Sequence, residues 1–244
     1  MALDRNTREV WEQVSTVLLA EHPKQDASEH LGLLTVMVGL RSVALFLDVD
    51  EPNATRVIRL VTPLGLTAFT TNGPTVAYTW QSAHPPEIAA VFRSRSPSKG
   101  VWVCRNRDDA RLIRGGITQI EAGRLLGYPQ CCIGGEQGRK ADFEDAVIRG
   151  YLRKFGGDPH TLARACAENR KVLVDYDPVN DRTPRARARF PFVQHVACEF
   201  CLTAEGTPTA VLNSEYEQLV AGVDPILHDY LAGVGKATAR ELVS

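Results

Sequence analysis

The amino-acid sequence predicts a mixed α/β fold of the α+β kind, with an antiparallel β-rich N-terminal half and a mainly helical C-terminal half. Short β-rich segments separated by turn residues dominate the first half, whereas helical periodicity and capping patterns dominate the second. Apolar residues make up 44% of the chain and charged residues 23%, which is ordinary for a globular protein. We therefore expect a β-meander domain with an N-terminal helix over residues 1–100 and a helical domain over residues 101–244.

The N-terminal half begins with a predicted helix over residues 6–20, because Val10, Trp11 and Val14 fall on one helical face. Turn residues such as "DEPN" and "TNGP" then separate a series of β-rich segments. We expect these segments to form an antiparallel meander with one buried face, followed by a buried strand at "VWVCR". The segments of the meander are "LLTVMVGL", "SVALFLDV", "RVIRLVTP", "LTAFTTN" and "TVAYTW".

The C-terminal half carries helix start and stop signals. Thr118 and Glu121 have the spacing of a capping box, and Gly127 ends the predicted helix that they begin. Residues 141–155 and 158–171 also have helical patterns. A second capping-box pattern, "SEYE" at residues 214–217, precedes the predicted C-terminal helices.

Charge and hydropathy limit the partners and the compartment. The 28 basic and 29 acidic residues give a net charge of -1, so nothing in the overall charge favours nucleic acid or an anionic membrane. No apolar run approaches the roughly 20 residues that span a bilayer, and the N-terminus lacks the apolar core of a signal peptide. We expect a cytoplasmic protein with no membrane partner, in which clustered cysteines indicate metal binding or catalysis more than disulfides.

Two cysteine motifs carry the predicted chemistry. "GYPQCC" ends on an adjacent pair, and "HVACEFC" has the spacing His-x-x-Cys-x-x-Cys. A Cys-x-x-Cys loop lets both sulfurs turn toward one centre, which is why it recurs in zinc and iron-sulfur sites. The predicted metal ligands are Cys131, Cys132, Cys198 and Cys201, with His195 as a further ligand or a hydrogen-bond partner of the ligands.

The adjacent pair bears on the identity of the metal. Neighbouring side chains of an extended strand point to opposite faces, so two such thiols need a bent backbone to serve one ion. A multinuclear cluster accepts neighbouring sulfurs more easily, and we keep both an iron-sulfur cluster and zinc as cofactors. A redox dithiol or buried core thiols without metal are the other interpretations. Cys104, in an apolar strand, and Cys166, on an alanine-rich helix, fit buried small hydrophobes.

The motifs "LLGYPQCC" and "PFVQHVACEFC" resemble those of an uncharacterised, mainly archaeal family with Gly-Tyr-Pro-x-Cys-Cys and a later His-x-x-Cys segment. This resemblance covers roughly residues 118–220 and implies a metal-type site without implying a reaction. That family usually has an aromatic residue after the pair and a longer gap between the last cysteines, whereas this chain has "CCIGGEQ" and "CEFC". The order Cys104, adjacent pair, Cys-x-x-Cys also resembles the Cys-rich domain of heterodisulfide-reductase-type proteins.

The segment "YLAGVGKATAREL" at residues 230–242 resembles a helix-hairpin-helix. In such a hairpin Gly233 and Gly235 would form a tight turn, and Lys236 with a helix N-terminus would face a nucleic-acid phosphate. A helix C-cap at Gly233 is the structural alternative. Four arginines could extend a basic patch toward phosphate or form a solvated linker; they are Arg182, Arg185, Arg187 and Arg189.

Two functions follow from these motifs. The first is an enzyme that uses the metal centre for redox or sulfur-transfer chemistry on a small molecule or nucleotide, with Arg124, Glu136 and Arg139 near the pair to hold an anion or shuttle protons. The same three side chains could instead form surface salt bridges. The second is a nucleic-acid-binding module with structural zinc. The chain has no Walker loop, no His-Glu-x-x-His and no Ser-His-Asp order, which argues against common NTPases and hydrolases.

Overall fold

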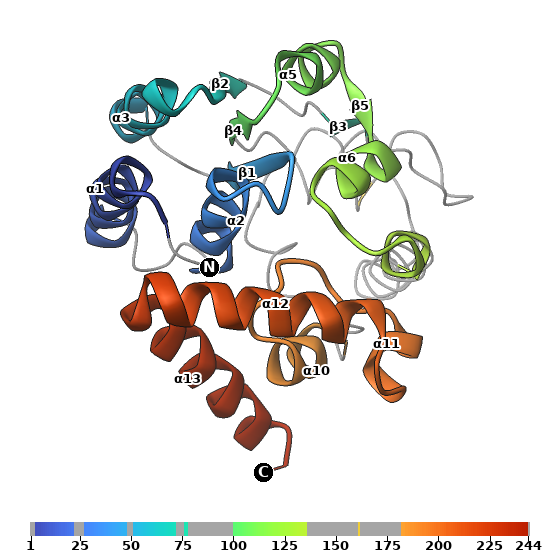
Figure 1. Cartoon of the computed structure of the whole chain (residues 1–244). Coiled ribbons are helices and arrows are strands. Elements are labelled where there is room, and N and C mark those ends of the chain that lie inside the picture. Colours follow the sequence, from blue (N-terminus) through green and yellow to red (C-terminus); the bar gives the residue numbers. More distant parts are fainter. Residues whose placement is uncertain are drawn as a thin grey trace.

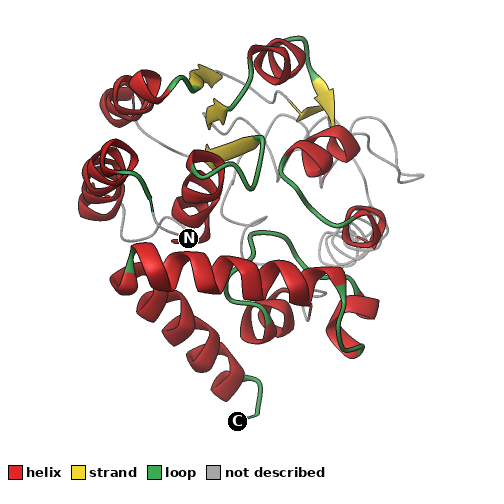
Figure 2. Ribbon diagram, in the orientation of Figure 1, coloured by secondary structure: helices red, strands yellow, loops and turns green. Residues whose placement is uncertain are grey.

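A computed structural model gives the structure of the protein and describes residues 3–21, 27–47, 51–71, 76–77, 100–135, 161 and 182–243. Over these residues the fold is mixed and mostly helical, with a small three-stranded antiparallel sheet (Figure 1, Figure 2). The helices are α1 (Arg5–Glu21), α2 (Ala27–Met37), α3 (Glu51–Val61), the 3-10 turn η1 (Thr62–Leu64), α5 (Arg107–Arg114), α6 (Gln119–Leu125), α10 (Arg182–Arg189), α11 (Glu199–Thr203), α12 (Pro208–Val223) and α13 (Pro225–Glu241), and residues 130–135 are helical too. A two-residue parallel pair joins β3 (Val76–Ala77) to β5 (Ile117–Thr118).

The central strand of the main sheet is its last strand in the sequence. β4 (Gly100–Cys104) lies between β1 (Val43–Leu47) and β2 (Thr67–Thr71) and is antiparallel to both. All five of its residues are buried. Because a sheet of this order needs the chain to return between two earlier strands, the predicted meander is wrong, although the antiparallel pairing is confirmed.

Side chains alternate along each strand, so the sheet presents two faces, and each packs against a separate apolar core. On one face Phe46 and Val103 join a large core that includes residues of α1, α2, α12 and α13. On the other face Trp102 and Cys104 join a smaller core with residues of α5 and α6. Figure 1 shows the long helix α12 between α13 and the α1–α2 layer, and α12 contacts both α2 and α13. The expectation of one buried face is therefore wrong.

Two predicted strands, at residues 33–40 and 56–63, are wrong because their apolar residues belong to helices. Residues 33–37 complete α2, and residues 56–61 complete α3. Leu33 and Leu34 of α2 are both fully buried although they point to different sides of the helix. A helix that is apolar on all sides has no polar stripe, so its sequence does not show the helical period.

The predicted domain boundary falls at the first residues of β4, so the described sheet contains strands from both predicted domains.

The predicted capping box is confirmed, because the Thr118 side chain accepts the Glu121 N–H and the Glu121 carboxylate accepts the Thr118 N–H. The second capping box is wrong, since residues 214–217 lie inside α12, which Thr207 caps. The predicted helices at residues 141–155 and 158–171 lie outside the described residues, apart from Thr161. No helix in the described part of the chain has the length and apolar character to cross a bilayer.

The predicted C-terminal hairpin is also wrong. α13 runs without interruption from Pro225 to Glu241, so Gly233 and Gly235 lie inside a helix and form no turn. Gly235 is buried against α10, and a Cβ there would stand 3.0 Å from the Cβ of Pro191. Because Gly235 has no side chain, α13 can pack closely at this position, which gives this glycine a structural role. Lys236 is exposed on the same continuous helix.

Candidate metal centre

The adjacent cysteines lie in the first turn of a helical segment that follows α6. Gly127 has a φ of +71°, a left-handed conformation that glycine adopts without strain, and it turns the chain away from α6. Pro129 comes just before the helical residues 130–135, and its carbonyl accepts the N–H of Cys132 at 2.9 Å. The helical turn supplies the bent backbone that two neighbouring thiols need to approach one centre.

The second motif places its cysteines at the start of another short helix. Cys198 is the N-cap residue of α11, and Cys201 lies in the first turn. The backbone N–H of Cys198 donates a hydrogen bond to the sulfur of Cys132 at 3.4 Å, so the two motifs contact each other directly. N–H donors at a helix start stabilise negative charge on sulfur.

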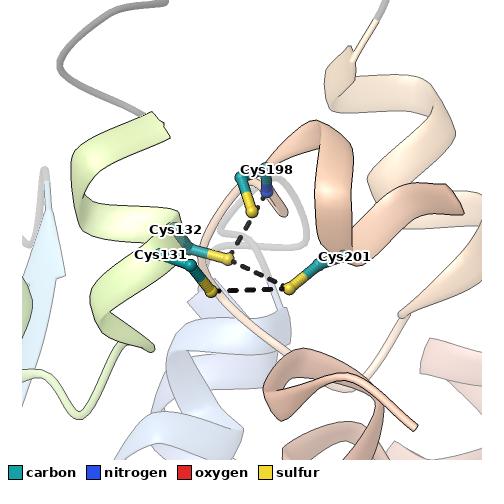
Figure 3. A group of neighbouring side chains, drawn as sticks. All are labelled: Cys131, Cys132, Cys198 and Cys201. Atoms are coloured by element: carbon teal, nitrogen blue, oxygen red, sulfur yellow. Dashed lines mark hydrogen bonds between the residues drawn. The ribbon is translucent and has the colours of Figure 1, made fainter. Parts of the chain in front are cut away.

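The four sulfur atoms converge on one point (Figure 3). They all lie within 4.8 Å of one another, and the Cys201 sulfur is 3.7 Å from the sulfurs of both Cys131 and Cys132. All four cysteines are free thiols. Cys131 is exposed at the surface, and the other three are buried at the edge of the large core. Four thiols from two distant motifs are thus close enough to share a metal ion, as the sequence predicted.

The surroundings give the four thiols different acidities. Burial acts to raise the pKa of Cys201, but hydrogen bonds from the Thr209 hydroxyl and N–H and from Thr207 outweigh it and lower the pKa to about 7. Burial, with the hydrogen bond to Cys201, raises the pKa of Cys131 to about 11. Burial also raises the pKa of Cys132 above its ordinary value. Metal binding and thiol ionisation are coupled, so a divalent cation would compensate the negative charge that forms when Cys131 and Cys132 lose their protons.

His195 lies beside the four sulfurs but is not one of the converging ligands. Its Nε2 is 3.0 Å from the Thr209 hydroxyl, and that hydroxyl is 3.2 Å from the sulfur of Cys132. Burial, together with the positive charge of Arg41, lowers the pKa of His195 to about 3, so the ring is neutral. Tyr128 of the first motif packs against this ring, with centroids 5.0 Å apart. His195 therefore reaches the candidate metal centre through Thr209, whose hydroxyl contacts the sulfur of Cys132.

Three of the four arginines that the sequence singled out hold the cysteine segments in place. Arg182 donates to the Gly135 carbonyl at 3.2 Å, just after the adjacent pair. Arg185 pairs with Glu199 of α11 at 2.7 Å. Arg189 donates to the carbonyls of Leu202 and Ala204 and so caps the end of α11. The expected basic patch is thus largely committed to contacts within the protein.

Other residues named from the sequence lie elsewhere. Cys104 is fully buried in the smaller core on the far face of the sheet and is not among the four converging thiols. Arg124 is exposed on α6. Glu136, Arg139 and Cys166 lie outside the described residues.

Sequence reasoning missed two residues at this site. Thr209 was not considered, although "TPT" at residues 207–209 is a helix-start signal that follows the Cys-x-x-Cys motif. Arg41 carried no prediction, because nothing local in the sequence signals that it is buried beside His195.

Comparisons of the chain with protein-family models, with curated proteins and with solved structures gave no match. The resemblance of the two cysteine motifs to known families therefore stays a prediction.

Proposed function

We propose that the protein is a metalloprotein in which Cys131, Cys132, Cys198 and Cys201 bind a single tetrahedral ion, most simply Zn²⁺. The sulfur–sulfur distances carry this proposal. A Zn–S bond of about 2.3 Å in a regular tetrahedron requires sulfurs about 3.8 Å apart. The two distances of 3.7 Å to Cys201 match that edge, and the limit of 4.8 Å holds for all pairs.

The same distances argue against the iron-sulfur cluster that the sequence favoured. Thiolates of a multinuclear cluster bind different iron atoms, so their sulfurs must lie further apart than those that share one ion. Four sulfurs within 4.8 Å of one another fit the ligands of one ion more closely than those of several irons with bridging sulfides. A single iron would fit the same tetrahedron, and its colour would distinguish it from zinc.

The proposed ion is structural. Four thiolates complete a tetrahedron and leave no open position for a substrate, as in closed structural zinc sites. The ion would join the helical segment 130–135 to α11, and the Thr209 hydroxyl at the start of α12 contacts both Cys132 and His195. Chemistry on a small molecule would then take place beside the metal, with the metal holding the site together.

Elemental analysis of full-length protein, purified anaerobically, tests the proposal. We expect one zinc per chain, no colour and no acid-labile sulfide. Serine substitution of any of the four cysteines should lower the zinc content, whereas Cys104→Ser, the matched control in the other core, should leave it unchanged. A brown protein with several irons and sulfides per chain would contradict the proposal and support a cluster.

A dithiol without metal is the second candidate, because the pKa of Cys201 is lowered to about 7 and two other thiols lie 3.7 Å away. It predicts a protein without bound metal whose thiols form disulfides reversibly under mild oxidation. Stoichiometric metal that survives dialysis would exclude it.

A further inference from the structure

One side of α13 is exposed along the length of the helix. The other side packs against α10, α12 and α2, and Figure 1 shows α13 at the outer edge of the molecule. On the exposed side Ile226 is 79% exposed and Tyr230 is 53% exposed. Single exposed apolar side chains are common in proteins, but these two stand four residues apart and so lie next to each other on one helix face. This face of α13 therefore has the apolar character of a contact surface.

Two small residues continue this apolar surface. Gly233 and Ala237 follow Tyr230 by three and seven residues, so they share its face, and both are exposed. No atom of the described residues lies within 4 Å of a Cβ built on Gly233, so packing within the chain does not require a glycine there. A glycine inside a helix is less stable than an alanine. A partner that needs space at this position gives Gly233 a reason.

Charged residues line the other flank of the same face in a defined order. Asp229 precedes Gly233 by four residues, whereas Lys236 and Arg240 follow it by three and seven. All three are exposed, and the helical period places them together on the flank away from Tyr230. The flank is thus acidic before Gly233 and basic after it. Such an order is complementary to an antiparallel copy of itself.

We propose that the protein forms a homodimer in which α13 packs against α13 of a second copy, with the two helices antiparallel and in contact at Gly233. A residue four positions before this point then lies near residues three and seven positions after it in the other copy, offset by about 1.5 and 4.5 Å along the axis. Asp229 therefore lies between Lys236 and Arg240 of the second copy, and the two-fold symmetry makes this contact twice. Its neighbour His228 leaves the Asp229 side chain 84% exposed for the contact.

The apolar flank fits the same arrangement. Tyr230, three positions before the point of contact, lies over Ala237 and Gly233 of the second copy, and these small residues leave space for its ring. A parallel pair with two-fold symmetry would instead place the charged flank of each copy against the apolar flank of the other. The order of the charges therefore favours the antiparallel pair.

The small size of the contact sets its expected strength. Stable interfaces bury roughly 1,200–2,000 Å² in total, and one pair of 17-residue helices falls below this range. We expect a dimer with a Kd on the order of 100 µM, so dilute protein is monomeric. The proposal does not depend on the metal centre, and its test gives the same answer whether or not zinc is bound.

Sedimentation velocity of the full-length protein, from about 5 to about 500 µM, tests the proposal. We expect a change from monomer to dimer across this range. Tyr230→Ala should weaken the dimer by about fivefold or more, because it removes a large aromatic side chain from the contact. Leu112→Ala removes an exposed apolar side chain of α5 as a matched control and should change nothing.

Charge reversal tests the antiparallel register. Asp229→Lys brings like charges together at both contacts, and the double variant Lys236→Glu with Arg240→Glu does the same, so each alone should dimerise at least about tenfold more weakly. In an equimolar mixture each contact of a mixed dimer again joins acidic to basic side chains. Mixed dimers should therefore form about as readily as the natural dimer. An N-terminal fluorophore on one variant lets its sedimentation report the mixed dimer alone.

Three outcomes would overturn the proposal. One is a chain that stays monomeric over the whole range, which would leave this face of α13 to a different partner. Another is a dimer that Tyr230→Ala weakens no more than Leu112→Ala does, which would place the interface elsewhere. The third is a mixture of the two charge variants that dimerises no better than either variant alone, which would contradict the antiparallel pairing.

Discussion

The backbone of Gly135 lies directly against the side chain of Cys198. A Cβ on Gly135 would stand 2.6 Å from the Cβ of Cys198, closer than two such carbons approach in proteins. The neighbouring Gly134 faces open space, with nothing within 4 Å of a Cβ built there. The helix that carries the adjacent cysteines therefore approaches the second motif at a position where any side chain would hold them apart.

Gly135→Ala should weaken zinc binding, because the added methyl group pushes Cys198 away from the other sulfurs. Overpacking of this kind costs about 1–3 kcal/mol, which corresponds to a loss of zinc affinity of roughly 5- to 150-fold. Competition with a chromophoric chelator measures the affinity. Gly134→Ala is the matched control and should bind zinc as the natural protein does; equal affinity of the two variants would show that the close contact does not limit the centre.

Zinc binding should release protons and weaken as the pH falls. The raised pKa values of Cys131 and Cys132 keep both thiols protonated at pH 8 in the metal-free protein, so at least two protons leave when the ion binds. The apparent affinity should then fall by about a hundredfold per pH unit. Below pH 7 the dependence should steepen, because Cys201, with its pKa lowered to about 7, also becomes protonated.

Chelator competition from pH 8.5 to pH 6 measures this dependence, and a proton count in weak buffer provides an independent check. An affinity that does not change with pH would contradict thiolate coordination by these residues.

The two glycines of α13 should respond in opposite directions to alanine. Gly233 is exposed and has nothing within 4 Å of a Cβ, so Gly233→Ala should stabilise the protein by up to about 1 kcal/mol through helix propensity. Gly235→Ala should be less stable than Gly233→Ala by about 1 kcal/mol or more, because its Cβ meets Pro191 at 3.0 Å. Urea unfolding measures both variants. Destabilisation by Gly233→Ala would instead support a turn at this position.

Cys104 should not react with thiol reagents in the native protein. Burial, with a smaller contribution from the charge of Asp109, raises its pKa to about 12. Because the folded state favours the neutral thiol, the buried Cys104 contributes stability that is present below pH 9 and is lost as the pH rises toward 12. Alkylation of zinc-free protein at pH 8, followed by peptide mass spectrometry, should leave Cys104 unlabelled until denaturant is added. Rapid labelling under native conditions would contradict its burial in the smaller core.

The convergence of the four thiols could be predicted from the sequence because it follows from chemistry. A chain with ordinary apolar content can form its core without them, so two cysteine pairs beside turn residues indicate a metal site more than packing. Their geometry could not be predicted. The sequence indicated that the adjacent pair needs a bent backbone but not which conformation supplies it; the helical turn after Pro129 brings the sulfurs of Cys131 and Cys132 to the same distance from Cys201.

The helices of the N-terminal half were mispredicted for two different reasons. α2 is buried on all sides and has no polar stripe, so no periodic signal existed to be found. α3 has its buried residues Ala54, Val57 and Val61 at helical spacing, and Pro52 stands near its start. This helical spacing was present in the sequence, but "DEPN" was interpreted as a turn and "RVIRLVTP" as a strand, so the helix was not predicted. The roles of Arg41 and Thr209 depend on tertiary contacts between distant segments, which a single sequence does not reveal.

The position of β4 has a consequence for synthesis on the ribosome. Among the described residues, neither β1 nor β2 has a partner in the main sheet until β4 has been translated, since both outer strands pair with β4. A nascent chain that ends before residue 100 would expose unpaired strand edges and both apolar surfaces, a state prone to aggregation. Such fragments should therefore depend on chaperones for solubility, and truncation at the β4 boundary should yield insoluble protein.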